Sequence, residues 1–248
     1  MVGPSQNSPS PVTRDFLAGR FRDQLAGEDL LELESLLSEP RLLADRQVLI
    51  ARGEKAHQAT LLVEGYLLRS ISRDNKRFIV GIHVPGDFVD LHGLMLKRLD
   101  HDILAVGPAR IAQVPHEELD RVIRIRPSIA RALWFATLLD AAIHRQWIRN
   151  LEALDAPQRI AHLFAELHHR LRQIGHNVNR ALRTPFTQSD LADMCGVSAI
   201  HANRAVARLR ELGLAEIRRG DLYTSDWKAL EAYAGFDPAY LYGEEMSR

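Results

Sequence analysis

The sequence predicts an α+β protein in which an N-terminal antiparallel β-roll is followed by a long helix and a mainly helical C-terminal module. Between about residues 47 and 114, short segments alternate apolar and polar residues and are separated by glycine-containing turns. An uninterrupted helical pattern then covers 127–151, and the remaining chain returns to shorter helices and a hairpin pattern. We expect a disordered tail over 1–13, the roll over 14–126, the long helix over 127–153 and the C-terminal module over 154–248.

Composition excludes several classes of site. With 248 residues, 46% of them hydrophobic, the chain can bury more than one core. Charges balance at 32 basic and 32 acidic residues, so a basic surface must come from local segregation of charge. The single cysteine, Cys195, excludes an internal disulfide and a cysteine-ligated zinc or iron–sulfur site. No segment approaches the roughly 18 apolar residues of a membrane helix, and the N-terminus lacks a signal pattern, so we expect a cytoplasmic protein without a membrane partner.

The first elements follow from hydrophobic spacing. Apolar residues recur at helical intervals from about Asp15 to Leu43, which predicts a helix that Pro40 ends. Turns at Gly53, Gly65 and Pro85-Gly86-Asp87 then divide the roll. The strands expected between and beyond these turns are 47–50, 59–63, 66–71, 77–84, 103–106 and 110–114.

The long helix carries two apolar stripes where an ordinary surface helix needs one. Phe135, Leu139 and Ile143 form the stripe that can cover the roll. The second stripe can meet a symmetry mate. The predicted dimer interface therefore comprises Trp134, Leu138, Ala141, Arg145 and Ile148, although Arg145 interrupts the apolar pattern. The alternative is that both stripes belong to the core of one chain.

The C-terminal module contains the most informative segment, Thr187 to Arg210. After a helix capped by Asp155, Thr187 is placed to cap a short helix, with Asp190 completing a capping box. Gly196 supplies the tight turn, and Ser198 caps a second helix that runs to about Leu212. This pattern is typical of a helix-turn-helix. Inward-facing positions are Leu191, Ala192, Cys195, Ala202, Ala205, Val206 and Leu209.

The second helix has the character of a DNA recognition helix. Arg204 can bind guanine, Asn203 can bind adenine or a phosphate, and Ile200 can contact a thymine methyl group. A hairpin around residues 219–221 would form a wing beside it. The predicted DNA-binding residues are Thr187, Gln188, Ser198, Ala199, Ile200, His201, Asn203, Arg204, Arg208, Arg218 and Arg219. The alternative for this segment is an ordinary helical hairpin with solvated charges.

In order and spacing, these motifs resemble the Crp/Fnr superfamily of bacterial transcription regulators over nearly the whole chain. The resemblance is carried by Gly53-Glu54, Glu64-Gly65, Pro85-Gly86-Asp87-Phe88, the long helix, Thr187 to Ala192, Asn203-Arg204, the wing and Phe236 to Leu241. It implies a cyclic-nucleotide-binding-like roll, a dimerisation helix and a winged helix-turn-helix. It also implies a homodimer on palindromic double-stranded DNA, with RNA polymerase as a partner.

The effector chemistry of the family does not carry over. In members that bind cAMP, a Glu holds the ribose hydroxyl and an Arg-Ser pair binds the cyclic phosphate. Counted from Gly86, these positions hold Leu91 and His101-Asp102. A carboxylate repels a phosphate and Leu91 offers no hydrogen bond, so we expect no cAMP binding by the usual mode. A shifted alignment that brings Arg98 to the ligand is the alternative. The predicted pocket of an unknown small-molecule effector comprises Gly86, Asp87, Phe88, Leu91, His92, His101 and Asp102.

Two further family features are also altered. Well-studied members carry a Glu at the position of Ile200, and those that bind cAMP carry an Arg at that of Ala199, whereas Arg204 is retained. We therefore expect a different half-site in which Arg204 still reads guanine. The oxygen-sensing branch holds an iron–sulfur cluster on N-terminal cysteines, which this chain lacks; Cys195 is expected to be an inert packing residue.

Two other functions are compatible with the sequence. One is a sensor module in which a cyclic nucleotide or haem controls DNA binding, and another is a small-molecule-binding module that has lost DNA binding. His83, His92 and His101 show no ligand spacing, so each is expected to be a surface or hydrogen-bonded histidine, and we predict no metal or cofactor. An enzyme is disfavoured because no nucleophile elbow, phosphate loop or metal-ligand pair is present.

Overall fold

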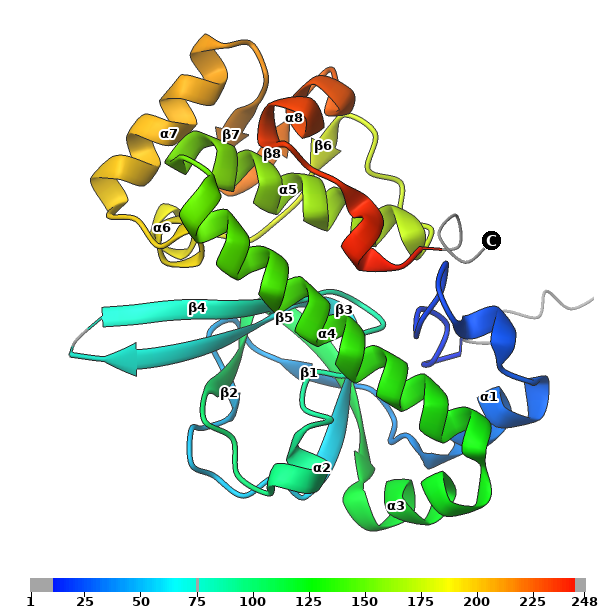
Figure 1. Ribbon diagram of the computed structural model, residues 1–248. Helices are drawn as coiled ribbons and strands as arrows, with labels where there is room; N and C mark the ends of the chain where they lie inside the picture. The colour runs from blue at the N-terminus through cyan, green and yellow to red at the C-terminus, as the bar shows by residue number, and fades with distance from the viewer. Residues whose placement is uncertain (1–10, 75, 244–248) are drawn as a thin grey trace, which may run out of the picture.

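The computed structural model describes residues 11–74 and 76–243. In Figure 1, a β-roll lies at the bottom, the helical module lies at the top, and one long helix, α4, runs diagonally across both. The predicted disordered tail falls largely on residues 1–10, outside the described residues. Its last part is fixed, because the backbone N–H groups of Val12 and Thr13 donate to the Glu34 carboxylate.

The roll is a five-stranded antiparallel sheet of order β1-β5-β3-β4, with β2 also paired to β5. Its strands are β1 (Arg41–Leu43), β2 (Val48–Ile50), β3 (Gln58–Arg73), β4 (Lys76–His83) and β5 (Asp102–Pro115). The four strands expected over 59–71 and 103–114 are thus two long ones. Gly65 lies inside β3, where the pairing register shifts, and a Cβ there would meet the carbonyl oxygen of Pro108. The glycine therefore marks a bulge in the pairing of β3 with β5 rather than a turn.

The predicted helix from Asp15 to Leu43 is wrong over much of its length. Only α1 (Gly27–Leu36) is α-helical, preceded by the 3₁₀ turn η1 (Arg22–Gln24) and followed by the unpredicted strand β1. Leu17 and Gly19 have positive φ angles of 53° and 66°, which an α-helix cannot accommodate. The apolar spacing reflects burial, since Phe16 and Leu17 lie in the roll core. Two further helices, α2 (Gly93–Leu96) and α3 (His116–Ile125), belong to the roll.

The helical prediction for 127–151 is confirmed by α4 (Pro127–Ala153). It leads into α5 (Ala156–Gln173), whose start has the expected Asp155 cap as part of a capping box with Gln158. The module continues with β6 (Ala181–Leu182), α6 (Gln188–Cys195), α7 (Ala199–Glu211), β7 (Glu216–Arg218), β8 (Asp221–Tyr223), α8 (Trp227–Ala234) and the 3₁₀ turn η2 (Pro238–Leu241). Its small sheet has the antiparallel order β6-β8-β7.

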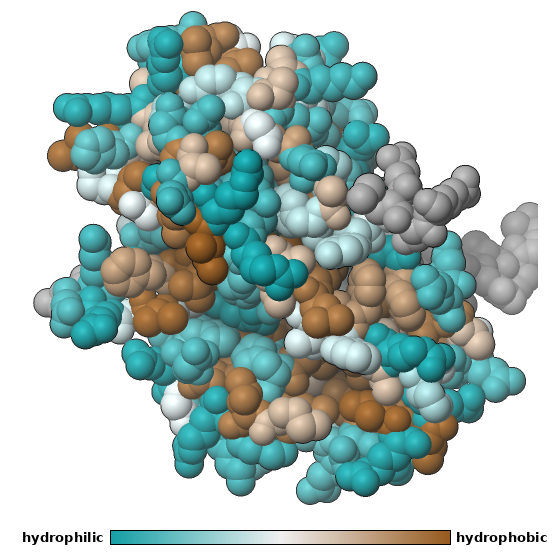
Figure 2. Space-filling model, viewed as in Figure 1, coloured by the Kyte–Doolittle hydropathy of each residue, from teal (hydrophilic) through white to brown (hydrophobic). Residues whose placement is uncertain are grey.

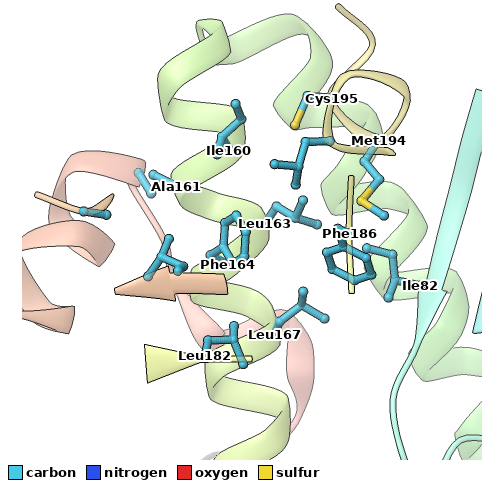
Figure 3. Packing of buried hydrophobic residues seen from close by; sticks show 14 of the residues in the cluster. Ile82, Ile160, Ala161, Leu163, Phe164, Leu167, Leu182, Phe186, Met194 and Cys195 are labelled. Carbon is cyan, nitrogen blue, oxygen red and sulfur yellow. The ribbon is translucent and has the colours of Figure 1, made fainter. Parts of the chain in front are cut away.

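The module and the roll share one hydrophobic core. In Figure 3, Ile82 from β4 points toward Phe186 and Met194 of the module, and Leu163 and Leu167 of α5 lie beside them. These residues are all less than 9% exposed. Because roll and module are packed into a common interior, the helix-turn-helix has a defined position on the roll.

A buried charged network reinforces this junction. The Arg170 guanidinium on α5 donates to the Ile82 carbonyl and the Asp87 carboxylate of the roll, and it pairs with Glu166 on its own helix. Glu166 also accepts hydrogen bonds from Trp147 of α4 and Tyr240 of η2. Three separate segments are therefore joined through one carboxylate, which makes the junction sensitive to loss of any partner.

Candidate nucleic-acid interface and effector pocket

The first helix of the pair, α6, begins as its sequence predicts. The Thr187 hydroxyl accepts the backbone N–H of Asp190 at 3.1 Å, and the Asp190 carboxylate accepts the backbone N–H of Thr187 at 2.8 Å. This is the predicted capping box. The inward positions Leu191, Ala192 and Cys195 are buried, and burial raises the pKa of the Cys195 thiol to about 12. Cys195 is therefore an unreactive packing residue, as expected.

The turn between the helices requires its glycine. Gly196 ends α6 in the left-handed conformation with φ of 64°. Ser198 then caps α7 by accepting the backbone N–H of His201 at 3.3 Å. On the back of α7, Ala202, Ala205 and Leu209 are at most 2% exposed. The second helix is thus held on the module by a buried apolar face, and its opposite face is available.

The outward face of α7 consists of exposed residues. Ile200 is 65% exposed, and among the described residues Asn203 and Arg204 have no hydrogen-bond or ion-pair partner. The other predicted contact residues on this helix and its cap, Ser198, Ala199, His201 and Arg208, are also exposed. Arg208 pairs with Glu211 at 3.6 Å. An unpaired guanidinium beside an amide and an aliphatic side chain can read base edges without first breaking an internal contact.

The predicted wing is present as the hairpin of β7 and β8. Its two-residue loop, Arg219-Gly220, has positive φ at both positions, 52° and 93°. Such a loop matches the right-handed twist of the strands. Arg218 pairs with Glu216 at 2.6 Å and lies over the Tyr223 ring, whereas Arg219 is exposed at the tip. A basic hairpin tip beside α7 can reach the DNA backbone.

Contacts between the roll and α6 were missed by the sequence analysis. Arg46 forms two hydrogen bonds with the Asp190 carboxylate, at 2.8 and 2.7 Å. Arg77 of β4 donates to Asp190 at 2.7 Å and to Asp193 at 2.8 Å. Burial opposes ionisation of Asp190, but the hydrogen bonds from Arg46 and Thr187 hold its pKa well below the usual range. The sequence gives no local signal for these contacts, because both arginines lie more than 100 positions from Asp190.

The predicted dimer stripe lies on the outside of α4. Trp134, Leu138 and Ile148 are 66%, 53% and 68% exposed, whereas Leu139 of the other stripe is buried against the chain. Figure 2 shows hydrophobic side chains interrupted by hydrophilic ones along the line of this helix. Ala141 is half-buried and Arg145 is exposed. The alternative that both stripes are core of one chain is therefore wrong for the isolated chain.

The predicted effector residues divide between two cavities. A cavity of about 550 Å³ between the roll and α4 is lined by Phe88, Leu91, His92 and His101, together with Arg69, Asp140, His144 and Arg145. Gly86 and Asp87 line a smaller cavity of about 30 Å³ beside Arg170. Asp102 lines neither, because its carboxylate accepts the backbone N–H of Arg52 at 2.7 Å. Arg98 is also absent from both linings and donates to the Gly53 carbonyl.

Of the three roll histidines, His101 is hydrogen-bonded as expected, because its Nδ1 lies 2.7 Å from the Asp100 carboxylate, and none of the three is a surface residue. His83 and His101 are 3% and 6% exposed, and His92 is half-buried. The Nε2 atoms of all three are buried without a hydrogen-bond partner among the described residues. Burial and the Arg69 charge lower the pKa of His83 and His92 to about 4 each, and burial also lowers the pKa of His101. These rings are therefore neutral near pH 7.

The wall of the 550 Å³ cavity contains an ion pair between buried Arg69 and half-buried Asp140. The Arg69 guanidinium on β3 donates to the Asp140 carboxylate on α4 at 2.6 Å and to the Val89 carbonyl at 2.6 Å. Arg69 therefore has a carboxylate partner already. A bound phosphate would compete with Asp140 for it, so the pocket contains no unpaired buried arginine of the kind a cyclic phosphate requires.

The described part of the chain holds neither a cluster of metal ligands nor a membrane-spanning helix. Residues 11–74 and 76–243 contain no group of three or more His, Cys, Asp or Glu side chains placed to hold a metal ion. None of their helices is long and apolar enough to cross a membrane.

Comparison with known proteins agrees with this geometry. Residues 158–233 match the family model of the Crp-like helix-turn-helix domain, and residues 40–126 match that of the cyclic nucleotide-binding domain. The transcriptional activator protein FnrA of Stutzerimonas stutzeri is 22% identical over 209 residues, which cover 84% of this chain and 85% of that protein. The transcriptional activator protein FnrL of Cereibacter sphaeroides is 26% identical over 198 residues, covering 77% and 78%.

The fold is also similar to that of a solved structure. FixK2 from Bradyrhizobium japonicum superposes with a TM-score of 0.70 at 19% identity, over 79% of this chain and 96% of that one. By their names, the two curated relatives are transcription regulators and not enzymes. Both family models lie in the expected order on the chain, and the helix-turn-helix has the caps, turn and wing described above. The chain therefore belongs to the Crp/Fnr superfamily of DNA-binding transcription regulators.

Proposed function

We propose that this regulator binds two-fold symmetric DNA as a homodimer and reads each half-site with the outer face of α7. The observation that carries this proposal is the unpaired, exposed set of Ile200, Asn203 and Arg204 on a helix whose back is buried. In a helix-turn-helix, this arrangement places side chains at base edges in the major groove. Arg204 would bind guanine, and Thr187, Gln188, Arg218 and Arg219 would hold the backbone.

The apolar stripe of α4 supports the dimer. Two copies related by a two-fold axis would bury the same residues from each chain, here Trp134, Leu138 and Ile148. Ala141 permits close approach of the two helices, and Arg145 would lie at the edge of the contact. Such a dimer would place its recognition helices about one helical turn apart, roughly 34 Å, on the DNA.

The roll is the proposed sensor. Its 550 Å³ cavity reaches α4, so a ligand there would contact both the roll and the helix that carries the dimer stripe. We propose that the effector is not cAMP bound in the usual mode, because Leu91, His101 and the occupied Arg69 replace the groups that would hold ribose and phosphate. As a gene regulator, the protein would act in the cytoplasm with RNA polymerase as its partner and without catalytic activity.

The direct test is selection from random double-stranded DNA followed by a mobility-shift titration. We expect one enriched two-fold symmetric motif, bound specifically at nanomolar protein concentrations. Arg204→Ala should weaken this binding, whereas Arg172→Ala, an exposed arginine on α5, should leave it unchanged. Failure to enrich any sequence from the pool would refute the proposed function.

A further inference from the structure

His92 and His101 come together at the wall of the roll cavity. His92 precedes α2, and His101 precedes β5, so the two lie nine positions apart in the sequence. In the fold their ring centroids are 5.1 Å apart, with the ring planes inclined by 42°. Both rings line the 550 Å³ cavity between the roll and α4.

The hydrogen bonding of His101 fixes which nitrogen is free. Its Nδ1 lies 2.7 Å from the Asp100 carboxylate, so Nδ1–H donates to Asp100 and the lone pair is left on Nε2. The Nε2 atoms of His92 and His101 are both buried and have no partner among the described residues. A buried nitrogen without a partner is costly, and two of them on adjacent rings point to a bound ligand. The Nε2 atom of His92 offers a lone pair, as that of His101 does, when its proton is on Nδ1.

The ring separation suits a shared metal ion. With metal–nitrogen bonds of about 2.0–2.1 Å, two imidazoles at a tetrahedral angle have centroids about 5 Å apart. A histidine that donates its other N–H to a carboxylate, as His101 does to Asp100, is the usual arrangement of a metal ligand.

We propose that His92 and His101 together bind one divalent transition-metal ion, such as Zn²⁺ or Co²⁺, in the roll cavity. Since no third metal-binding side chain of the described residues converges there, the other coordination positions would be filled by water or by a small ligand in the cavity. His144 also lines the cavity, but the described residues contain no group of three His, Cys, Asp or Glu side chains placed to hold one ion, so His144 is not counted as a ligand. This proposal rests on the roll being the sensor and names a metal as its signal.

The test is a titration of metal-free, full-length protein with Co²⁺ followed by visible absorption, and with Zn²⁺ by calorimetry. We expect one ion per chain. His92→Ala and His101→Ala should each weaken binding at least tenfold, and Asp100→Asn should weaken it by roughly 10- to 100-fold because the orienting carboxylate is lost. His57→Ala and His176→Ala, at exposed histidines away from the cavity, are the controls and should leave binding unchanged.

Two results would overturn the proposal. One is the absence of saturable binding of a single ion, and the other is binding that the His92 and His101 variants leave intact. If His101→Ala fails to fold by circular dichroism, His92→Gln at the half-buried position decides the question, because it removes a ligand with less disturbance of packing. The titration uses protein without DNA, so its failure is distinct from a failure of DNA selection.

Discussion

The outer face of α7 and the roll cavity are built in opposite ways. The face of α7 is formed by one continuous segment, its side chains are exposed, and two of its polar residues have no internal partner among the described residues. The cavity draws residues from strands, turns and α4, and its polar groups are buried, paired or shifted in pKa. A surface that binds DNA can be formed by one local segment, whereas a pocket for a small molecule is formed only when distant segments pack together.

The largest effect should come from breaking the dimer. The double variant Trp134→Asp/Leu138→Asp places charges on the exposed stripe and should make the protein monomeric, measured by light scattering. Because linked binding of two modules adds on the order of 100-fold or more in affinity, DNA binding should fall by at least that factor. Leu42→Asp, at an exposed apolar residue of β1, is the matched control. A variant that remains dimeric would place the interface elsewhere.

The second-largest effect should come from removing one side chain from the outer face of α7. Arg204→Ala should cost about 1–3 kcal/mol of DNA-binding free energy, roughly 5- to 150-fold in affinity, and relax the preference at one base pair. Thermal stability should not change, since the Arg204 side chain is exposed and forms no hydrogen bond or ion pair among the described residues. Competition binding to single-base variants of the selected site measures this effect. Equal loss on every sequence would reassign Arg204 to the DNA backbone.

The pH dependence of stability should arise at buried histidines, among them His83 of the roll, and not in α7. His83 has a folded-state pKa of about 4, below its ordinary value of 6.5, so the unfolded chain takes up a proton first as the pH falls. Stability from this group is complete above pH 6.5 and is lost between pH 6.5 and 4, at about 1 kcal/mol per pH unit.

Thermal unfolding at pH 7.5, 6.5 and 5.5 and fixed protein concentration measures this slope. His83→Gln should make the melting temperature depend less steeply on pH, whereas His57→Gln, at an exposed histidine, should not change the slope. The concentration is fixed because the melting of a dimer depends on it. An unchanged slope for His83→Gln would mean that the pKa of this ring is the same in the folded and the unfolded protein.

The smallest expected effect is that of cAMP on the cavity. A ligand at 100 times its dissociation constant adds about 2.7 kcal/mol to the free energy of unfolding, which corresponds to several degrees in melting temperature for a chain of this size. We expect no shift with cAMP, because Arg69 is paired with Asp140 and Leu91 offers no hydrogen bond. A saturable increase would show that the pocket rearranges to hold a cyclic phosphate.

The contrast between the two regions also explains what could be predicted from the sequence. The caps at Asp155, Thr187 and Ser198 and the positive φ of Gly196 depend on neighbours within a few residues, and all four predictions are confirmed. The helix expected from Asp15 was wrong because Leu17 and Gly19 adopt positive φ to fit the roll core. Local periodicity does not distinguish a helix from an irregular segment that is buried at similar intervals.

The cavity could be predicted only in part. Phe88, Leu91, His92 and His101 line the 550 Å³ cavity, whereas Asp102 does not, since its carboxylate accepts the backbone N–H of Arg52. The pairing of Arg69 with Asp140 and the contacts of Arg46 and Arg77 with Asp190 join residues that lie 71, 144 and 113 positions apart. No spacing rule connects residues at such distances; only the packed roll brings them together.

The central claim is that a homodimer places two copies of α7 in one two-fold symmetric site. Hydroxyl-radical footprinting of the selected DNA, combined with the stoichiometry of the complex, tests it most directly. We expect two protein chains per duplex and two protected segments related by a dyad, with their centres about one helical turn, roughly 34 Å, apart. A single protected segment, or one chain per duplex at saturation, would contradict the account.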